Sequence, residues 1–187
     1  DRRAKNLLWE LDNKKTLWLH LKMTGHLIFR PVDLSKSVRK LIEADKNNGY
    51  IHFSFIFKDG DRLDFSDLRK FGRIRLLNAT VAEIKKEPYK NGLGRLGPEP
   101  LARDFTVKVL TEQLLRSNKN IKEALLDQAI IAGIGNIYAS EILFEAKVDP
   151  RRKSKQLNKR EIEQVHFFTQ KVLGEAVKSG GTSVSDF

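Results

Sequence analysis

Apolar residues tend to alternate with polar ones in the first part of the chain and recur every three or four positions in the second. Up to residue 77 they form short runs, rich in β-branched and aromatic residues and bounded by turn residues. Such runs predict antiparallel strands. The predicted strands are Leu7–Leu11, Thr16–Met23, His26–Arg30, Tyr50–Phe57, Arg62–Phe65 and Gly72–Leu77.

The clearest alternation runs from Ile51 to Phe57 and sets one isoleucine and three phenylalanines on one face. It predicts a strand that packs an aromatic face against a core. Asp59-Gly60 then predicts a type I′ hairpin turn, which needs positive φ at both central residues. The preceding stretch Pro31–Gly49 is polar and, apart from a short turn near 38–44, predicts a flexible insertion.

Helical spacing begins after a cluster of glycine and proline at residues 92–100. The first predicted helix has Asp104 as its N-cap and carries Val107 and Leu114 on one face. Asn158 and Glu161 stand three apart and predict a capping box at the start of the last helix. Strands followed by helices predict the α+β class, with a partial antiparallel β-sandwich in residues 1–96 and a helical domain in residues 97–187.

The stretch Ile121–Phe144 predicts two helices joined by a tight turn that contains Gly133 and Gly135. Asn136 stands where an N-cap belongs. A glycine turn that opens into a helix exposes backbone N–H groups and the positive end of the helix dipole, which together bind phosphate. Lys122 would add a formal charge. The other interpretation of the same pattern is a turn followed by a capped helix.

The charge of the chain indicates a polyanionic partner. Its formal net charge is +11, and residues 1–100 hold 21 Lys and Arg against 13 Asp and Glu, a net charge of +8. With no cysteine, disulfides, thiol nucleophiles and cysteine-bound zinc are excluded, and the four scattered histidines predict no metal in this chain. No apolar run is long enough to span a membrane and no signal peptide opens the chain, so a cytoplasmic protein is predicted.

The central stretch Ile121–Phe144 resembles the helix-two-turns-helix segment of the formamidopyrimidine-DNA glycosylase and endonuclease VIII family. The resemblance extends from Arg2 to Phe187 and includes Gly97-Pro98-Glu99-Pro100-Leu101, which matches an interdomain signature of the family. It implies that Lys119, Lys122 and Asn136 hold the DNA backbone.

The resemblance also gives roles to two residues whose ordinary interpretation is structural. Arg2, Arg3 and Lys5 would ordinarily be a solvated edge, and Met23 a core gap-filler. The family has an Arg-Arg-x-Lys pattern just before a strand, and its lysine reaches the lesion phosphate and is implicated in proton transfer. It also has a His-Leu-x-Met-Ser/Thr-Gly loop whose methionine fills the space left by an extruded nucleotide. Lys5 and Met23 match these positions.

The loop Asp67–Gly72 combines a cation and an aromatic ring. An enzyme that acts on a base must extrude it and plug the gap, which calls for an apolar wedge and a donor for the orphaned base. Phe71 and Arg69 match these roles in the family's Asp-x-Arg-Arg/Lys-Phe-Gly loop; the alternative is an exposed hairpin with Phe71 folded inward. Where the family commonly reads Lys-His-Asp-His, this chain has Tyr50 in place of the first histidine and retains His52.

The grouping of Arg69, Phe71 and Met23 resembles the oxidised-purine branch of the family. It implies a base-excision DNA repair enzyme, a glycosylase and abasic-site lyase that binds damaged double-stranded DNA as a monomer and cleaves by β,δ-elimination. No residue matches the family's N-terminal proline nucleophile or its zinc finger. The expectation is therefore an internal fragment, inactive alone and without a cofactor, of a protein that binds one structural zinc.

Two other interpretations remain open at this point. One is a non-catalytic nucleic-acid-binding protein that uses a helix-two-turns-helix to hold RNA, which would need neither the strand-rich half nor the loop of Arg69 and Phe71. The other is a catalytically silent relative that only binds lesions.

Overall fold

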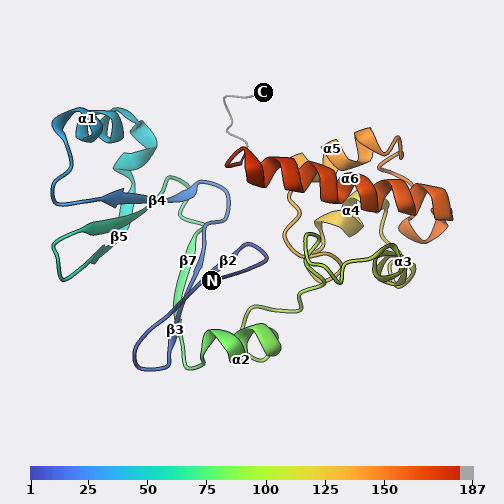
Figure 1. Ribbon diagram of the computed structural model, residues 1–187, viewed down its shortest axis with the longest axis horizontal. Coiled ribbons are helices and arrows are strands. Elements are labelled where there is room, and N and C mark those ends of the chain that lie inside the picture. The colour runs from blue at the N-terminus through green and yellow to red at the C-terminus, as the bar shows by residue number, and fades with distance from the viewer. Residues whose placement is uncertain (182–187) are drawn as a thin grey trace. The chain divides into compact units, whose positions relative to one another are not determined.

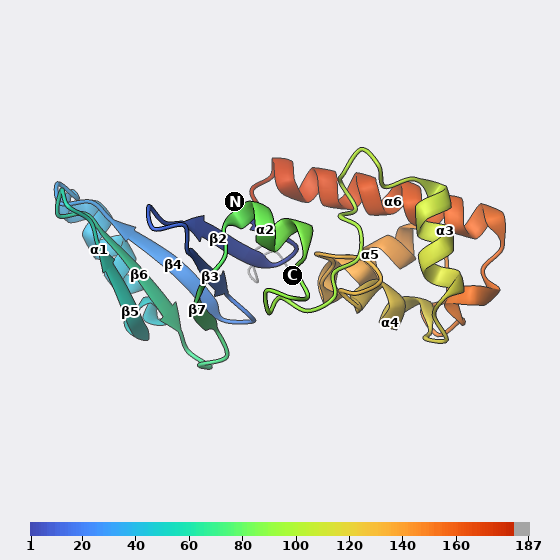
Figure 2. The same ribbon diagram turned by 90° about the horizontal axis from the view of Figure 1, so that it is seen from below.

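The computed structural model describes residues 1–181, and its contacts divide the chain into two compact units, Asp1–Ala82 and Glu83–Phe187 (Figure 1, Figure 2). The first unit is built mainly of strands and the second mainly of helices, which confirms the α+β class. The predicted domain boundary between residues 96 and 97 stays a prediction. Residues 182–187 of the predicted second domain lie outside the described residues.

The first unit contains two antiparallel sheets. The four-stranded sheet has the order β1 (Arg2–Arg3), β2 (Asn6–Glu10), β3 (Thr16–His20), β7 (Arg73–Leu77), and the three-stranded sheet has the order β4 (Gly25–Arg30), β6 (Arg62–Asp67), β5 (Ile51–Ile56). Every predicted strand is present, with its ends shifted by a few residues. Strand β3 stops at His20, before Met23, because Lys22 adopts a positive φ of 60° and turns the chain.

The aromatic face of β5 packs differently from the prediction. Phe53 is 43% exposed, and its ring stacks edge-on against Phe55 with 4.7 Å between centroids. Phe55 in turn meets the ring of Trp9, on β2 of the other sheet, at 5.6 Å. The rings therefore join the two sheets at a partly open edge, and the expectation that this face is buried in a core is wrong.

The stretch predicted as a flexible insertion is ordered, which corrects that prediction. It contains helix α1 (Lys36–Ala44) and the short 3₁₀ helix η1 (Lys46–Gly49). The Ser35 side chain accepts a hydrogen bond from Val38 N and so caps α1. Val38, Leu41 and Ile42 of α1 recur at helical spacing, but none of them is buried, and the polar residues around them obscured this short helix in the sequence.

The turn between β5 and β6 also differs from the prediction. Gly60 has a φ of 92°, whereas Asp59 is not among the described residues with positive φ, so the turn is not type I′. Gly60 N donates to Phe57 O at 3.0 Å, and Phe57 N donates to Asp61 O at 2.9 Å. This arrangement is a turn followed by one left-handed glycine, a common way to close a slightly longer hairpin loop.

Four α-helices surround the core of the second unit. They are α3 (Val107–Leu115), α4 (Ile121–Leu126), α5 (Asn136–Glu145) and α6 (Lys159–Lys178), with the 3₁₀ helix η2 (Ser154–Gln156) between α5 and α6 and α2 (Val81–Lys86) spanning the division between units. Their apolar stripes meet in one cluster. Its fully buried members include Leu110, Leu114, Ile121, Leu125, Ile142 and Val165.

Two helix starts in this unit test the predicted caps. The capping box of Asn158 and Glu161 is confirmed: each side chain accepts from the backbone N–H of the other residue. Asp104 does not cap α3. That helix begins two residues later than the cap predicts, and the Thr106 side chain accepts from Val109 N instead.

The packing of α5 predicts a matched pair of substitutions. Ile142 is fully buried and Ile137 on the same helix is 44% exposed. Ile142→Ala should lower the free energy of unfolding by about 2–5 kcal/mol, because the cavity adds to the lost transfer energy. Ile137→Ala should cost under about 1 kcal/mol. Urea unfolding followed by circular dichroism measures both, and equal losses would contradict the assigned orientation of α5.

Candidate nucleic-acid interface

The turn between α4 and α5 is held by one amide side chain. Gln128 accepts from Gly133 N through Oε1 at 2.8 Å and donates through Nε2 to the carbonyl oxygens of Leu126 and Ile134, both at 3.0 Å. Gly133 has a φ of 95°, which an L side chain would strain. The two-helix element thus presents a turn of fixed shape.

The interdomain signature predicted from sequence packs against this turn. Gly97 N donates to Gln128 O at 2.8 Å, and Ala132 N donates to Pro98 O at 3.0 Å. A Cβ on Gly97 would lie only 2.4 Å from Ile130 O, so glycine is required by this close approach. The segment at residues 97–98 therefore braces the turn.

The N-terminus of α5 differs from the prediction in its cap but keeps the arrangement predicted to bind phosphate. Gly135, and not Asn136, is the N-cap; Asn136 is the first helical residue and is exposed. No side chain caps this helix. The positive end of a ten-residue helix therefore opens toward solvent beside an exposed amide, which is the arrangement that binds phosphate.

The two predicted lysines of this unit have different surroundings. Lys119 Nζ lies 2.5 Å from Asp127 Oδ2, so much of its charge is already balanced. Burial opposes ionisation of Asp127, but the hydrogen bonds from Lys119 and from Ala129 N, with the charge of Lys119, together outweigh it and lower the pKa of Asp127. Lys122 is half-buried and lines a cavity of about 550 Å³ together with Ser140 and Phe144. Lys122 is therefore the stronger candidate for an unshared phosphate contact.

In the first unit, three predicted residues come together at the tips of two loops. Met23 is 72% exposed and Phe71 is 51% exposed. Arg69 lies between them, with Nη1 3.3 Å from Met23 Sδ and its guanidinium carbon 4.8 Å from the centroid of the Phe71 ring. Two large apolar side chains and the guanidinium of Arg69 therefore lie together at the loop tips. The alternative in which Phe71 folds inward is wrong.

The second of these loops is closed by a buried carboxylate. Asp67 is fully buried; its Oδ2 accepts from Gly72 N at 2.7 Å, and its Oδ1 accepts from Arg69 N at 3.3 Å. Burial alone would raise the pKa of Asp67, but hydrogen bonds from Thr24 and from the backbone of Gly72, Arg69 and Phe71 lower it below its ordinary value. The loop is therefore built around an ionised group.

Lys5 belongs to a cluster of positive charges that the sequence pattern did not reveal. Partial desolvation, then the charge of Lys22, lowers the pKa of Lys5, and desolvation followed by Lys22 and Lys5 lowers that of His20. Arg73 adds to the effect on His20, since the two are paired across β3 and β7. An anion bound here would relieve this repulsion. Only the strand register brings Arg73 into the group.

Residues with a strained backbone lie next to the predicted site residues of the first unit. Five described non-glycine residues have positive φ, and three of them directly precede a predicted site residue or lie between two of them. Ala4 precedes Lys5, Lys22 precedes Met23, and Lys70 separates Arg69 from Phe71. Such conformations cost of order 1–3 kcal/mol each and cluster at functional sites.

His52, the retained histidine, serves the structure of this loop. Its Nε2 lies 2.9 Å from the carbonyl oxygen of Asp67, and Asp67 N donates to Tyr50 O at 3.0 Å. The segment at residues 50–52 therefore supports the base of the loop that carries Arg69. Tyr50 itself is 43% exposed.

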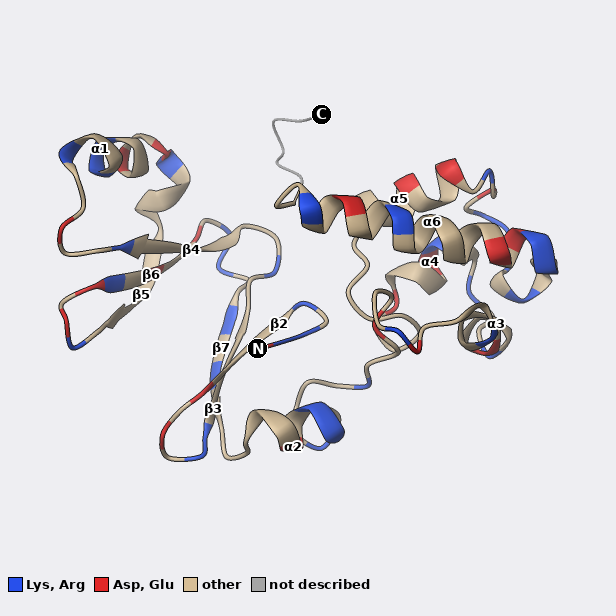
Figure 3. Ribbon diagram, in the orientation of Figure 1, with Lys and Arg blue, Asp and Glu red and all other residues tan. Residues whose placement is uncertain are grey.

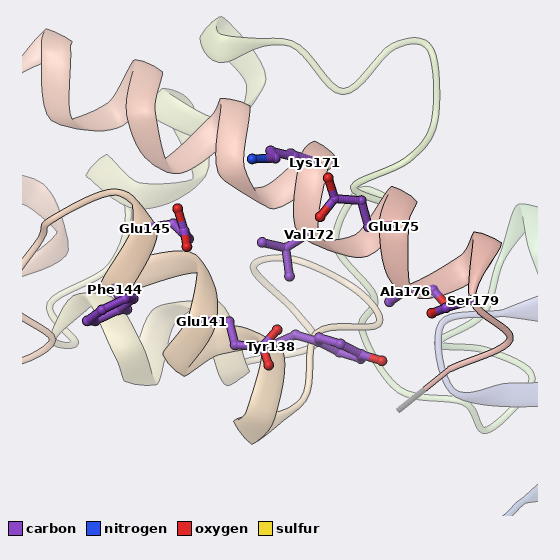
Figure 4. A pocket seen from close by; sticks show the side chains of 9 residues that line it. All are labelled: Tyr138, Glu141, Phe144, Glu145, Lys171, Val172, Glu175, Ala176 and Ser179. Atoms are coloured by element: carbon purple, nitrogen blue, oxygen red, sulfur yellow. The ribbon is translucent and has the colours of Figure 1, made fainter. Parts of the chain in front are cut away.

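A separate groove of about 360 Å³ lies between α5 and α6 (Figure 4). It is lined by Tyr138, Glu141, Phe144, Glu145, Lys171, Val172, Glu175, Ala176 and Ser179. Its three carboxylates make no hydrogen bond or ion pair with the described residues. These carboxylates would repel a phosphate backbone, so we do not assign this groove to the candidate nucleic-acid interface. Figure 3 shows the same acidic stretches on both helices.

Residues 1–181 contain neither a candidate metal site nor a candidate membrane-spanning helix. No group of three or more His, Asp or Glu side chains is placed to hold a metal ion. The four histidines instead bond to backbone or amide groups: His20 to Lys22 N, His26 to Thr24 O and Asn48 Oδ1, His52 to Asp67 O, and His166 to Phe105 O. No helix in this part of the chain is long and apolar enough to cross a membrane.

Two family models match the chain. The formamidopyrimidine-DNA glycosylase N-terminal domain matches residues 1–74, and the formamidopyrimidine-DNA glycosylase H2TH domain matches residues 96–187. The formamidopyrimidine-DNA glycosylase of Moorella thermoacetica is 40% identical over 187 residues, and that of Lactobacillus helveticus is 36% identical over 187 residues. Both matches cover all of this chain but only 62% of the relative, so the chain spans about three fifths of their length.

Solved structures of this kind share the fold. The formamidopyrimidine-DNA glycosylase of Lactococcus lactis, bound non-covalently to DNA with an abasic site, aligns with a TM-score of 0.81 and 32% identity, covering all of this chain and 64% of that one. A MutM complex with DNA containing carbocyclic 8-oxo-G aligns with a TM-score of 0.80 and 32% identity, covering 99% of this chain and 64% of that one.

The buried carboxylate predicts a pH-dependent stability. Asp67 has a lowered pKa in the folded state, so its contribution is fully present above the unfolded value of about 3.9 and is lost as pH falls through the folded value. Asp67→Asn should lower the free energy of unfolding by roughly 1.5–3 kcal/mol at neutral pH. The difference from wild type should shrink below about pH 4.

Urea titrations from neutral pH down to about pH 3 measure this difference. Asp33→Asn is the control, because Asp33 is exposed and makes no hydrogen bond within residues 1–181. A difference for Asp67→Asn that stays constant over the whole range would contradict the role of its ionised form.

Proposed function

The chain belongs to the formamidopyrimidine-DNA glycosylase family, and from this premise we propose that the whole protein excises oxidised purines from double-stranded DNA and cleaves the resulting abasic site by β,δ-elimination. The observation that carries the proposal is the cluster of Met23, Arg69 and Phe71 at the tips of two braced loops. Met23 and Phe71 stay largely exposed in this cluster, so they remain available to a partner.

The chemistry of base extrusion supports this use of the cluster. A base taken out of the stack leaves an apolar gap and an unpaired partner. Phe71 and Met23 offer apolar surface for the gap, and the guanidinium of Arg69 offers planar donors for the orphaned base. Because Arg69 already contacts both apolar side chains, the three enter the duplex as one unit.

The positive cluster around Lys5 supplies the lesion phosphate contact. An ammonium whose pKa is lowered by desolvation and by Lys22 releases a proton more readily than an ordinary lysine. Lys5 is therefore assigned to proton transfer during strand cleavage, with His20 and Lys22 as further phosphate contacts. A bound phosphate would also offset the mutual repulsion of these groups.

The second unit supplies contacts that do not depend on base sequence. Lys122 and Asn136, with the uncapped N-terminus of α5, are proposed to hold the DNA backbone, and Lys119 adds a weaker contact because Asp127 neutralises it. The family's structural zinc does not fit these residues, since the chain has no cysteine and its histidines are engaged elsewhere. No step of the proposal runs through a metal.

The first test separates backbone grip from lesion readout. In the full-length protein, Lys122→Ala should weaken binding to damaged and undamaged duplexes by similar factors and reduce the salt slope by about 0.9, because one phosphate contact is lost. Arg69→Ala should act mainly on damaged duplexes and depend on the opposite base, because its partner is exposed only after extrusion. Titrations at several salt concentrations measure both.

Matched controls make this test specific. Lys171→Ala removes an exposed lysine from the acidic groove, and Arg39→Ala removes an exposed arginine from α1. Neither should change lesion selectivity, and Lys171→Ala should leave the salt slope unaltered. If Lys122→Ala behaves like Lys171→Ala, the proposal that the two-helix element binds the DNA backbone through Lys122 is wrong.

The second test concerns the nucleophile. No residue of the chain matches the family's N-terminal proline, so residues 1–187 alone should form no borohydride-trapped adduct with an oxidised-guanine or abasic duplex. Gel analysis after trapping measures the adduct. A robust adduct would show that another amine of this chain attacks the sugar, and its loss in Lys5→Ala would identify that amine.

A further inference from the structure

The hydroxyl of Thr24 is shared between the two loops that carry the gap-filling cluster. Thr24 directly follows Met23 in the first loop. Its Oγ1 donates to Asp67 Oδ1 at 2.5 Å and accepts from Arg69 N at 3.1 Å in the second loop. One oxygen atom therefore joins segments that are more than forty residues apart in the sequence.

The directions of these two hydrogen bonds are fixed by chemistry. An ionised carboxylate only accepts, so the Thr24 hydroxyl must donate its single proton to Asp67. The backbone N–H of Arg69 only donates, so it must use a lone pair of the same oxygen. A side chain without a hydroxyl makes neither bond and leaves Arg69 N with Asp67 Oδ1, at 3.3 Å, as its remaining acceptor.

The remaining atoms of Asp67 leave it no alternative orientation. Its Oδ2 is taken by Gly72 N, and its carbonyl oxygen is approached by His52 Nε2 at 2.9 Å and Lys70 N at 3.3 Å. A Cβ on Gly72 would stand 2.3 Å from Phe65 Cζ, so the far end of the loop lies close against this ring and requires glycine. The second loop is thus rigid at its base, and Thr24 is where the first loop attaches to it.

The contacts at the tips are weak by comparison. Met23 and Arg69 touch only through a sulfur atom and one guanidinium nitrogen, and both side chains are exposed. A thioether is a weak acceptor, so this contact does not set the register of the loops. The pairing of β4 with β6, which places Gly25 opposite Asp67, sets the register, and the hydrogen bonds of Thr24 extend this pairing by one residue into the loops.

We propose that Thr24 is a positioning residue that fixes Met23 against Arg69 and Phe71, so that the three side chains enter the gap together and discriminate damaged from undamaged DNA. This inference rests on the proposed function of the cluster. It assigns lesion discrimination, and not overall DNA affinity, to a side chain that need not touch the DNA.

The central test compares Thr24→Val with Thr24→Ser in the full-length protein. Valine keeps the shape and loses the hydroxyl, whereas serine keeps the hydroxyl. Thr24→Val should reduce affinity for an oxidised-guanine duplex by about ten-fold or more, the size expected for a lost hydrogen bond to a charged group, with undamaged duplex affected less than about two-fold. Thr24→Ser should restore the wild-type ratio.

Two control variants separate a failure of the positioning role of Thr24 from a failure of the proposed function of the cluster. Thr111→Val removes a hydroxyl that bonds only within α3 and should leave the ratio unchanged. Arg69→Ala tests the proposed function itself. If Arg69→Ala abolishes discrimination and Thr24→Val does not, only the positioning role is overturned. If neither changes discrimination, the proposed function of the cluster fails first.

A purely structural role gives a different pattern. Equal losses for damaged and undamaged duplexes in Thr24→Val, with no rescue by serine, would overturn the proposal. Should Thr24→Val fail to fold, hydrogen exchange of the Arg69 amide is compared between wild type and Thr24→Ala. The amide donates to Thr24 Oγ1 and to Asp67 Oδ1, so Thr24→Ala should speed its exchange, and unchanged exchange would overturn the proposal.

Discussion

One buried carboxylate, that of Asp67, holds together the two loops that carry Met23, Arg69 and Phe71. Removing Asp67 from water is unfavourable unless its charge is matched by donors, and here a hydroxyl and backbone N–H groups supply them. Those donors come from the same segments that carry the exposed cluster. Because these donors bind Asp67, the bases of both loops are held in place. The side chains at the loop tips are left exposed to solvent.

In the second unit a neutral side chain, that of Gln128, holds a turn in the way that Asp67 holds the loops of the first unit. Gln128 accepts from one backbone N–H and donates to two carbonyl oxygens, so one amide fixes the turn before α5. In both units a single polar side chain beneath a turn sets the position of groups that face solvent. The difference lies in pH response, because the amide does not titrate and the carboxylate does.

Local patterns in the sequence predicted the strands, the long helices and the capping box at Asn158, because each depends on residues a few positions apart. The resemblance supplied Met23, Arg69 and Phe71. What could not be predicted depends on register and tertiary contact. The hydroxyl of Thr24 meets Asp67 only after β4 pairs with β6. The helical spacing of Val38, Leu41 and Ile42 in α1 was, by contrast, present in the sequence.

Helix α5 carries its charges in an order that works against its own stability. Glu145 lies in the last turn, where the negative end of the dipole disfavours it by about 0.3–1 kcal/mol, while the first turn is left without an acidic residue or a side-chain cap. The helix is thus electrically polarised from one end to the other. The uncapped end of α5 thus attracts an anion and the end that carries Glu145 repels one, so the helix itself distinguishes the two directions from which an anion could approach it.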